Sequence, residues 1–261
     1  MNPQTCEKTV HVIPGNAQYI GMRTEQQDAF AFSDVLDETV LSQQGALAVV
    51  ADGMGGMRNG REASTIAVKT FLSDYCTRCV NNQIEEALDH AIRQANAAVY
   101  GLAAECGVVS QMGTTLVAAA VYGGALYWAS AGDSRLYVYR DNFLIQQTQD
   151  HVYGTLLEEQ TACGLITRED ADKNEEKHAL FSFLGMSGIE RIDKNKVPIK
   201  LHAHDKILLC SDGLYNTLSY DEIADCLNGA PQQAADLLIE RVKAKNLHHQ
   251  DNMTALILEI Y

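Results

Sequence analysis

The stretch V-V-A-D-G-M-G-G, from Val49 to Gly56, limits what this chain can fold into more than any other part of it. Apolar residues over 46–51 indicate a buried strand, yet the strand runs directly into Asp52 and a cluster of glycines. Strand interiors disfavour both aspartate and glycine. The pattern therefore predicts that a buried strand ends at an open edge, where a carboxylate and bare backbone are available for chemistry.

The other apolar patterns predict an α+β fold, with antiparallel sheets in the middle and helix pairs outside. Two consecutive amphipathic helices are predicted over 60–106, and two more over 221–227 and 232–245. A polar, helix-prone segment occupies 152–177. The predicted strands cover residues 9–23, 28–33, 46–51, 114–122, 125–131, 135–140, 143–147, 206–210 and 253–260.

Composition narrows the class of partner. The 261-residue chain is 46% hydrophobic and 21% charged, and its formal net charge of −14 argues against nucleic acid and anionic membrane. No apolar run is long enough for a spanning helix, and the N-terminus lacks a secretory pattern, so we expect a cytoplasmic protein. Its seven cysteines should then be reduced, and the C-x-x-C at Cys76 and Cys79 favours a structural role over zinc or redox chemistry.

Five aspartates share one context, because each lies at the edge of a predicted strand, and three of them have a neighbouring glycine. They are Asp28, Asp52, Asp133, Asp212 and Asp251. The strands of one sandwich can bring such ends together, and Mg²⁺ and Mn²⁺ prefer oxygen ligands. Any one of these residues taken alone is better explained as a turn former. Five in the same context predict a centre for divalent cations.

The glycines that follow Asp52 need their own explanation. Gly53 has no side chain, so its carbonyl can approach a metal ion as a further ligand. Gly55 and Gly56 allow the chain to turn sharply into the next helix. A plain glycine turn is the alternative, but it does not account for the recurrence of Asp-Gly at positions 212 and 213.

Six blocks, taken in order, resemble the metal-dependent type 2C serine/threonine protein phosphatases, in the bacterial form of that family. The blocks are R-T-E-Q-Q-D-A (23–29), V-V-A-D-G-M-G-G (49–56), M-G-T-T-L (112–116), A-S-A-G-D-S-R-L-Y (129–137), L-C-S-D-G-L (209–214) and Q-D-N-M-T (250–254). The resemblance runs from about residue 15 to the C-terminus. It implies one domain over 1–261, a four-layer α/β/β/α sandwich with a two-metal centre at one edge of the sheets, and a flap at about 152–177.

The resemblance also implies roles for individual residues. Asp52 matches the ligand that bridges two Mn²⁺ or Mg²⁺ ions, Asp28 a carboxylate that holds metal-bound water, and Asp133 a ligand to a weaker third ion. The residues that match metal-site positions are Asp28, Asp52, Gly53, Asp133, Asp212 and Asp251. The residues that match catalytic positions are Arg23, Asp52, Asp212 and Asp251.

Arg23 matches the residue that binds the substrate phosphate. A guanidinium pairs bidentately with phosphate, which fits this role. The alternative for Arg23 is a surface ion pair.

Three features depart from the family pattern. Gln27 stands where many eukaryotic members carry Glu, and Met54 stands where they carry a histidine proposed as general acid. Methionine cannot donate a proton, so that role falls to water or is absent. His151 matches a common family residue, with a structural hydrogen-bonding role as the alternative. F-S-F-L-G over 181–185 lacks the arginine of the usual T-R-A-L-G, and the flap sequence gives no specificity that we can interpret.

The resemblance implies hydrolysis of phosphoserine and phosphothreonine in proteins by a metal-activated water, reversing a cognate serine/threonine kinase. No phosphoenzyme is needed, so the cysteines should be spectators, and the enzyme is expected to be a monomer. One alternative is a non-catalytic phosphoprotein-binding scaffold, which would require the loss of ligands that are present at Asp52, Asp212 and Asp251. Another is a hydrolase of small phosphate esters, which a two-metal site alone does not exclude.

Overall fold

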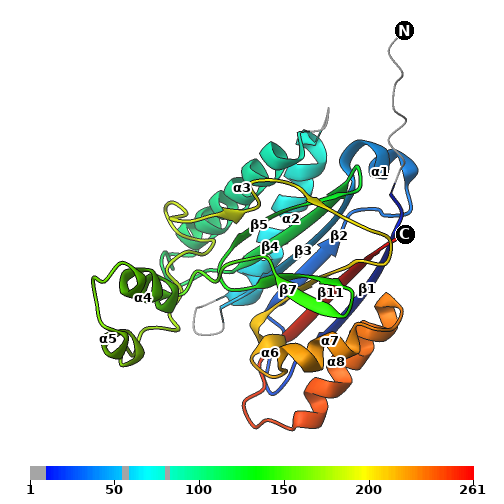
Figure 1. Cartoon of the computed structure of the whole chain (residues 1–261). Helices are drawn as coiled ribbons and strands as arrows, with labels where there is room; N and C mark the ends of the chain where they lie inside the picture. The colour runs from blue at the N-terminus through cyan, green and yellow to red at the C-terminus, as the bar shows by residue number, and fades with distance from the viewer. Residues whose placement is uncertain (1–9, 55–58, 80–82) are drawn as a thin grey trace.

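Two antiparallel sheets form the middle of the molecule in the computed structural model, which describes residues 10–54, 59–79 and 83–261 (Figure 1). The first sheet has the strand order β1 (Val12–Tyr19), β11 (Met253–Ile260), β10 (Lys206–Cys210), β6 (Arg135–Arg140) and β7 (Phe143–Gln146). The second has the order β2 (Asp28–Phe32), β3 (Ala46–Asp52), β4 (Leu116–Tyr122), β5 (Ala125–Ala131) and β8 (Asp193–Lys194), and β9 (Ile199–Lys200) also pairs with β5.

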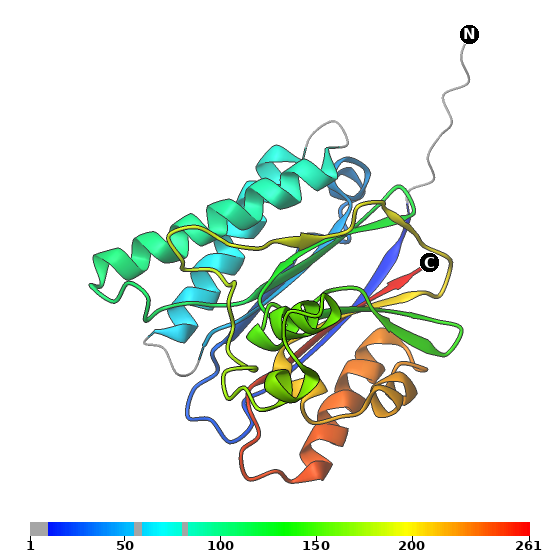
Figure 2. The ribbon, with the colours of Figure 1, turned by 60° about the vertical axis from the view of Figure 1, so that its left-hand side comes forward.

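Helices cover the outer faces of both sheets. Helices α2 (Gly60–Arg78) and α3 (Ile84–Glu105) pack on the second sheet, while α7 (Tyr220–Cys226) and α8 (Pro231–Lys245) pack on the first. Figure 2 shows the sheets between these two pairs. The segment with α4 (Tyr153–Ala162) and α5 (Arg168–Asp172) projects from the sandwich in Figure 1. The four-layer α/β/β/α prediction is confirmed.

Three hydrophobic clusters explain why the sequences of the central strands are unbroken runs of apolar residues. One cluster lies between the sheets, and one lies under each helix pair. In β3, Leu47 and Val49 face the α2–α3 cluster, while Ala48 and Val50 face the other sheet. Because both faces of the strand are covered, its residues are buried as far as Ala51, and partial exposure begins at Asp52.

Several elements differ from the sequence predictions. Strand β1 ends at Tyr19, so Arg23 lies in a loop, and position 9 lies outside the described residues. A short helix, α1 (Glu38–Gln44), was not predicted, although the Asp37 side chain accepts hydrogen bonds from two amides of its first turn. Helix α6 (Asp212–Tyr215) and the two-residue strands β8 and β9 were also missed, because such short elements leave no periodic signal.

Within the described ranges, no helix is both long enough and apolar enough to cross a membrane. The longest, α3, has 22 residues, and its first turn already carries Glu85 and Glu86. Its apolar residues form one stripe, which packs in the cluster under the second sheet.

Candidate metal centre

Asp28 and Asp52 lie opposite each other at one end of the second sheet, because β2 and β3 pair in that register. Asp28 also reaches the first sheet. Its Oδ2 accepts hydrogen bonds from Ser211 Oγ at 2.8 Å and from Thr254 Oγ1 at 2.7 Å. Ser211 follows β10, and Thr254 lies in β11. The Asp28 carboxylate therefore joins the two sheets at the place where their strand ends meet.

Asp212 and Asp251 come to this end from the first sheet. Asp212 begins α6 just after β10, and Asp251 lies just before β11. The two turns pack tightly, since a Cβ on Gly213 would lie 2.0 Å from the carbonyl oxygen of Asn252. Arg23 joins them from the loop after β1, where its Nη2 donates to Asp251 Oδ2 at 2.6 Å. The structure thus brings Arg23 to the predicted site, with a carboxylate as its partner.

Asp133 lies in the loop between β5 and β6, which neighbouring side chains hold in place. Tyr215 Oη donates to the Asp133 carbonyl at 2.9 Å. Thr115 Oγ1 lies 2.6 Å from Ser134 Oγ and accepts a hydrogen bond from the Asp52 amide at 3.0 Å. The loop of Asp133 is therefore tied both to α6 and to the end of β3.

A pocket of about 380 Å³ opens where these loops meet the end of the flap. Its lining residues are Asp52, Met54, Thr115, Asp133, His178, Ala179, Leu180, Phe183 and Asp212. Three of the predicted aspartates thus face one pocket, together with the position where the family histidine is replaced. Asp28, Asp251 and Arg23 are not part of this lining, but the charges of Asp28 and Asp251 act on Asp52.

Burial and mutual repulsion oppose ionisation of these carboxylates. Burial raises the pKa of Asp52 well above its ordinary value, and the charges of Asp28 and Asp212 raise it further. Burial, followed by the charge of Asp133, raises the pKa of Asp212 to about 7. The pKa of Asp28 rises to about 6 by burial, against hydrogen bonds that lower it, and that of Asp133 rises to about 6 by burial and the charge of Asp150. A bound cation would relieve this repulsion.

The raised pKa values predict an unusual pH dependence of stability in the metal-free protein. Between about pH 4 and about pH 7 the folded protein binds more protons at Asp212 than the unfolded chain does. The contribution of this site to the free energy of unfolding therefore falls as pH rises through that window. In EDTA, we expect the melting temperature of Asp212→Asn to fall less between pH 5 and 8 than that of the parent. Parallel melting curves for the two proteins would contradict this.

The donor set fits a hard divalent cation. Among the described residues, Asp28 Oδ1 and Asp212 Oδ1 are buried without a hydrogen-bond partner, which is costly for a carboxylate. Mg²⁺ and Mn²⁺ bind such oxygens. In the same ranges no three His, Cys, Asp or Glu side chains converge closely enough to form a ready-made metal site. Asp28, Asp52 and Asp212 have the chemistry to hold a cation here.

Gly53 has a packing role that its sequence context did not reveal. A Cβ at this position would lie 2.2 Å from the carbonyl oxygen of Gly60 and 2.6 Å from that of Gln27. The Gly53 amide also donates to the Gln27 carbonyl at 3.1 Å. A side chain is excluded here whether or not the Gly53 carbonyl binds a metal, which stays a prediction. The turn predicted at Gly55 and Gly56 lies outside the described residues.

His151 is a structural hydrogen bonder, the alternative left open by the sequence. Its Nδ1 accepts from the Gly132 amide at 3.1 Å, and its own amide donates to the Gly132 carbonyl at 3.0 Å. The Phe181 amide donates to the His151 carbonyl at 2.9 Å. Burial lowers the pKa of His151 to about 4, so the ring is neutral. It connects the loop before Asp133 to the segment that closes the flap.

No sequence pattern indicated that the residues just after the flap line the pocket. His178, Ala179 and Leu180 come just after the predicted flap boundary, and Phe183 lies in the block already seen to depart from the family. They are distant in sequence from the aspartates and have no motif of their own. Only the folded chain places them beside Asp52.

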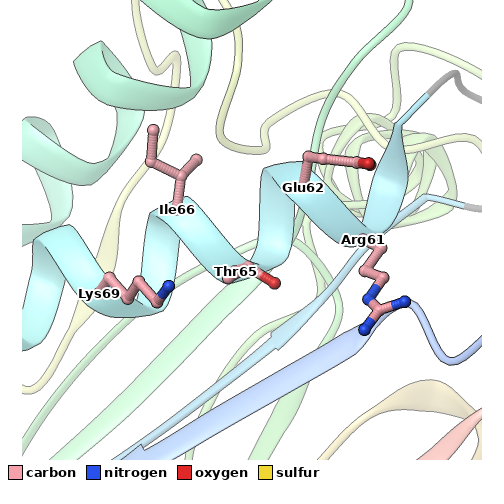
Figure 3. A pocket seen from close by; sticks show the side chains of 5 residues that line it. All are labelled: Arg61, Glu62, Thr65, Ile66 and Lys69. Atoms are coloured by element: carbon pink, nitrogen blue, oxygen red, sulfur yellow. The ribbon is translucent and has the colours of Figure 1, made fainter.

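A second pocket, of about 420 Å³, lies on the exposed side of α2, away from the carboxylates. Figure 3 shows that its five lining side chains all come from that one helix. Its charged lining residues are one carboxylate, Glu62, and two cations, Arg61 and Lys69. It contains none of the residues predicted from the sequence, so the 380 Å³ pocket is the candidate site.

Comparison with known proteins agrees with this geometry. The family model for protein phosphatase 2C matches residues 20–247. The chain belongs to the protein phosphatase 2C family. It is 36% identical over 219 residues to the serine/threonine phosphatase stp of Listeria welshimeri. The aligned region covers 82% of this chain and 84% of that protein. The resemblance stated from the six sequence blocks is thereby confirmed.

Solved structures of phosphatases in this family have the same fold. The serine/threonine phosphatase Stp1 of Staphylococcus aureus superimposes with a TM-score of 0.80 at 25% identity, over 100% of both chains. The catalytic domain of the phosphatase PstP, solved in complex with two manganese ions, gives a TM-score of 0.75 at 26% identity, over 97% of this chain and 99% of that one.

The cysteines of this protein phosphatase 2C stand apart from its candidate site. All six cysteines in the described ranges are free thiols, and none lines the pocket. Cys79 is buried, with its Sγ 3.9 Å from the carbonyl oxygen of Gln44, and Cys76 is half-buried. The C-x-x-C therefore belongs to the packing at the end of α2, as the sequence favoured.

Proposed function

We propose that this chain hydrolyses phosphoserine and phosphothreonine in proteins, with Mn²⁺ or Mg²⁺ as cofactor, and that it opposes a cognate serine/threonine kinase. The observation that carries the proposal is the gathering of Asp52, Asp133 and Asp212 around one pocket, where burial and mutual repulsion oppose their ionisation. Such a group of carboxylates destabilises the fold unless cations bind to it. Because the chain belongs to the protein phosphatase 2C family, we propose that these cations bind a phosphate group carried by a protein.

Several residues of the chain are the proposed cation ligands. Asp52, Asp212, Asp251 and the Gly53 carbonyl are the proposed ligands of two ions, with Asp28 beside them and Asp133 as ligand to a weaker third. When bound, divalent ions supply Lewis-acid stabilisation of phosphate oxygens and lower the pKa of water. Asp28 is suited to orient this cluster, since two hydroxyls fix its Oδ2 while Oδ1 stays free among the described residues.

Arg23 is the proposed phosphate-binding side chain. It is 49% exposed and lies in a loop at the rim of the site, so its guanidinium is accessible to a ligand. Its present partner is Asp251, at 2.6 Å. A guanidinium carries five donors, so it can contact a phosphate as well as a carboxylate. We infer that Arg23 orients the phosphate and stabilises its charge during hydrolysis.

The cell biology proposed for the enzyme follows from its charge and composition. We propose a cytoplasmic, monomeric phosphatase of one domain with the flap at about 152–177. With a formal net charge of −14, it is unsuited to nucleic acid or anionic membrane. Phosphorylated proteins, and the kinase that phosphorylates them, are its proposed partners.

Substrate comparison tests this function against the small-ester alternative. With Mn²⁺ present, we expect kcat/KM on a phosphothreonine peptide to exceed that on glycerol phosphate by about tenfold or more, because contacts to the peptide lower the transition-state energy. The measurement is phosphate release under matched conditions. Equal or greater kcat/KM on glycerol phosphate would favour the small-ester hydrolase, and binding of the peptide without phosphate release would favour the scaffold.

A further inference from the structure

We propose that His178 is the general acid of this phosphatase, donating a proton to the serine or threonine oxygen as that oxygen leaves phosphorus. The inference rests on the proposed function, and it answers a chemical need of that reaction. An alkoxide is a strong base and a poor leaving group, so breaking the P–O bond is faster when a positioned acid protonates the oxygen. Met54, which faces the same pocket, has no proton to give.

The other lining residues are unsuited to this proton transfer. Four of them carry no dissociable side-chain proton: Met54, Ala179, Leu180 and Phe183. The Thr115 hydroxyl is already held between Ser134 Oγ and the Asp52 amide. The three aspartates must be ionised to hold cations. His178 is the remaining member of the lining, and imidazole is the side chain whose ordinary pKa lies closest to neutrality.

The backbone on both sides of His178 is hydrogen-bonded, which holds this residue at the pocket. The Gly154 amide donates to the Lys177 carbonyl at 2.7 Å, and the Tyr153 amide donates to the Ala179 carbonyl at 2.8 Å. Both donors lie at the start of α4, directly after His151. The segment that carries His178 is therefore tied to the start of α4, which follows shortly after His151, and His151 bonds to the loop before Asp133. General acids require this kind of positioning more than they require an unusual pKa.

The ring of His178 is free to act. It is exposed at the edge of the pocket, and among the described residues it makes no hydrogen bond or ion pair. The charged groups that share its pocket are Asp52 of β3, Asp133 of the β5–β6 loop and Asp212 of α6. Lys177 is its charged neighbour along the chain. An unpaired imidazole at the mouth of a carboxylate pocket has no structural bond to lose when it donates a proton.

The proposed step balances in atoms and charge. The oxygen of the attacking water bonds to phosphorus, while the bond from phosphorus to the serine or threonine oxygen breaks. The electron pair of the broken bond stays on the departing oxygen, which takes the proton of the His178 imidazolium. The products are the free hydroxyl side chain and inorganic phosphate. The proton lost by the attacking water restores the imidazolium.

The test compares two leaving groups in the His178→Gln enzyme. With Mn²⁺, kcat on a phosphothreonine peptide should fall by about 100-fold, the usual contribution of a general acid. On para-nitrophenyl phosphate the fall should be about threefold at most, because its leaving group needs little protonation. Similar losses on both substrates, or no loss on the peptide, would overturn the proposal. A parent that hydrolyses neither substrate would overturn the proposed function itself, and the proposal with it.

Two further measurements separate proton donation from other roles of His178. Calorimetric titration should give the same Mn²⁺ affinity for His178→Gln and the parent, and a weaker affinity would make His178 a metal ligand instead. Adding Met54→His to the His178→Gln enzyme should restore peptide turnover by about tenfold or more, since position 54 lines the same pocket. The matched control is His202→Gln, an exposed histidine between β9 and β10, which should behave as the parent.

Discussion

Asp52→Asn should lower kcat on a phosphothreonine peptide by about 1,000-fold or more, while the protein stays folded. Metal-ion catalysis supplies several kcal/mol of charge stabilisation, and each 1.4 kcal/mol is about a factor of ten in rate. An amide keeps the shape of the carboxylate but is a weak ligand for a hard cation. Because burial and neighbouring charges raise the pKa of Asp52, the neutral amide should also raise the melting temperature in EDTA.

Circular dichroism and phosphate release measure these two effects on the same preparation. Asp225→Asn is the matched control, because Asp225 is exposed on α7 and its side chain makes no hydrogen bond or ion pair within the described part of the chain. That variant should retain the activity and melting temperature of the parent. Near-normal turnover by Asp52→Asn would place the active site elsewhere.

Withdrawal of divalent cations should abolish phosphate release, and Mn²⁺ or Mg²⁺ should restore it. The same cations should raise the melting temperature, because they bind the folded protein and relieve repulsion among Asp28, Asp52 and Asp212. At a cation concentration 100 times the dissociation constant, binding stabilises the folded state by about 2.7 kcal/mol.

The Asp52→Asn protein provides the control for this stabilisation. Its melting temperature should respond much less to Mn²⁺ than that of the parent, because the residue proposed to bind two ions has been replaced. Full turnover in buffer freed of divalent cations would refute the two-metal interpretation. An equal thermal shift in both proteins would show that Mn²⁺ binds outside this cluster.

The strands and their aspartates were predictable because the signals are local. An apolar run that stops at an aspartate indicates a buried strand and its open end within about seven residues. Four of the strands match the predicted limits at both ends: β5, β6, β10 and β11. The start of α1 also has a local signal, because Asp37 precedes Glu38 and caps the helix.

Features that depend on distant contacts were not predictable. The ion pair between Arg23 and Asp251 joins residues 228 positions apart, and no local pattern indicates it. The packing of Gly53 against Gly60 follows from how α2 meets the end of β3, so the sequence suggested a metal-binding explanation instead. A role for His178 was not predictable from the sequence, because it depends on the pocket that His178 shares with Asp52 and not on its neighbours in the chain.

The dual attachment of Asp28 affects how mutational screens of this enzyme should be interpreted. Its carboxylate belongs to β2 of one sheet and accepts hydrogen bonds from Ser211 and Thr254 of the other. A substitution at position 28 would therefore reduce both the abundance of folded protein and the turnover of each molecule. A screen that scores activity alone would merge these losses and rank Asp28 above residues that only perform chemistry. Normalising each variant to its folded fraction would separate the two.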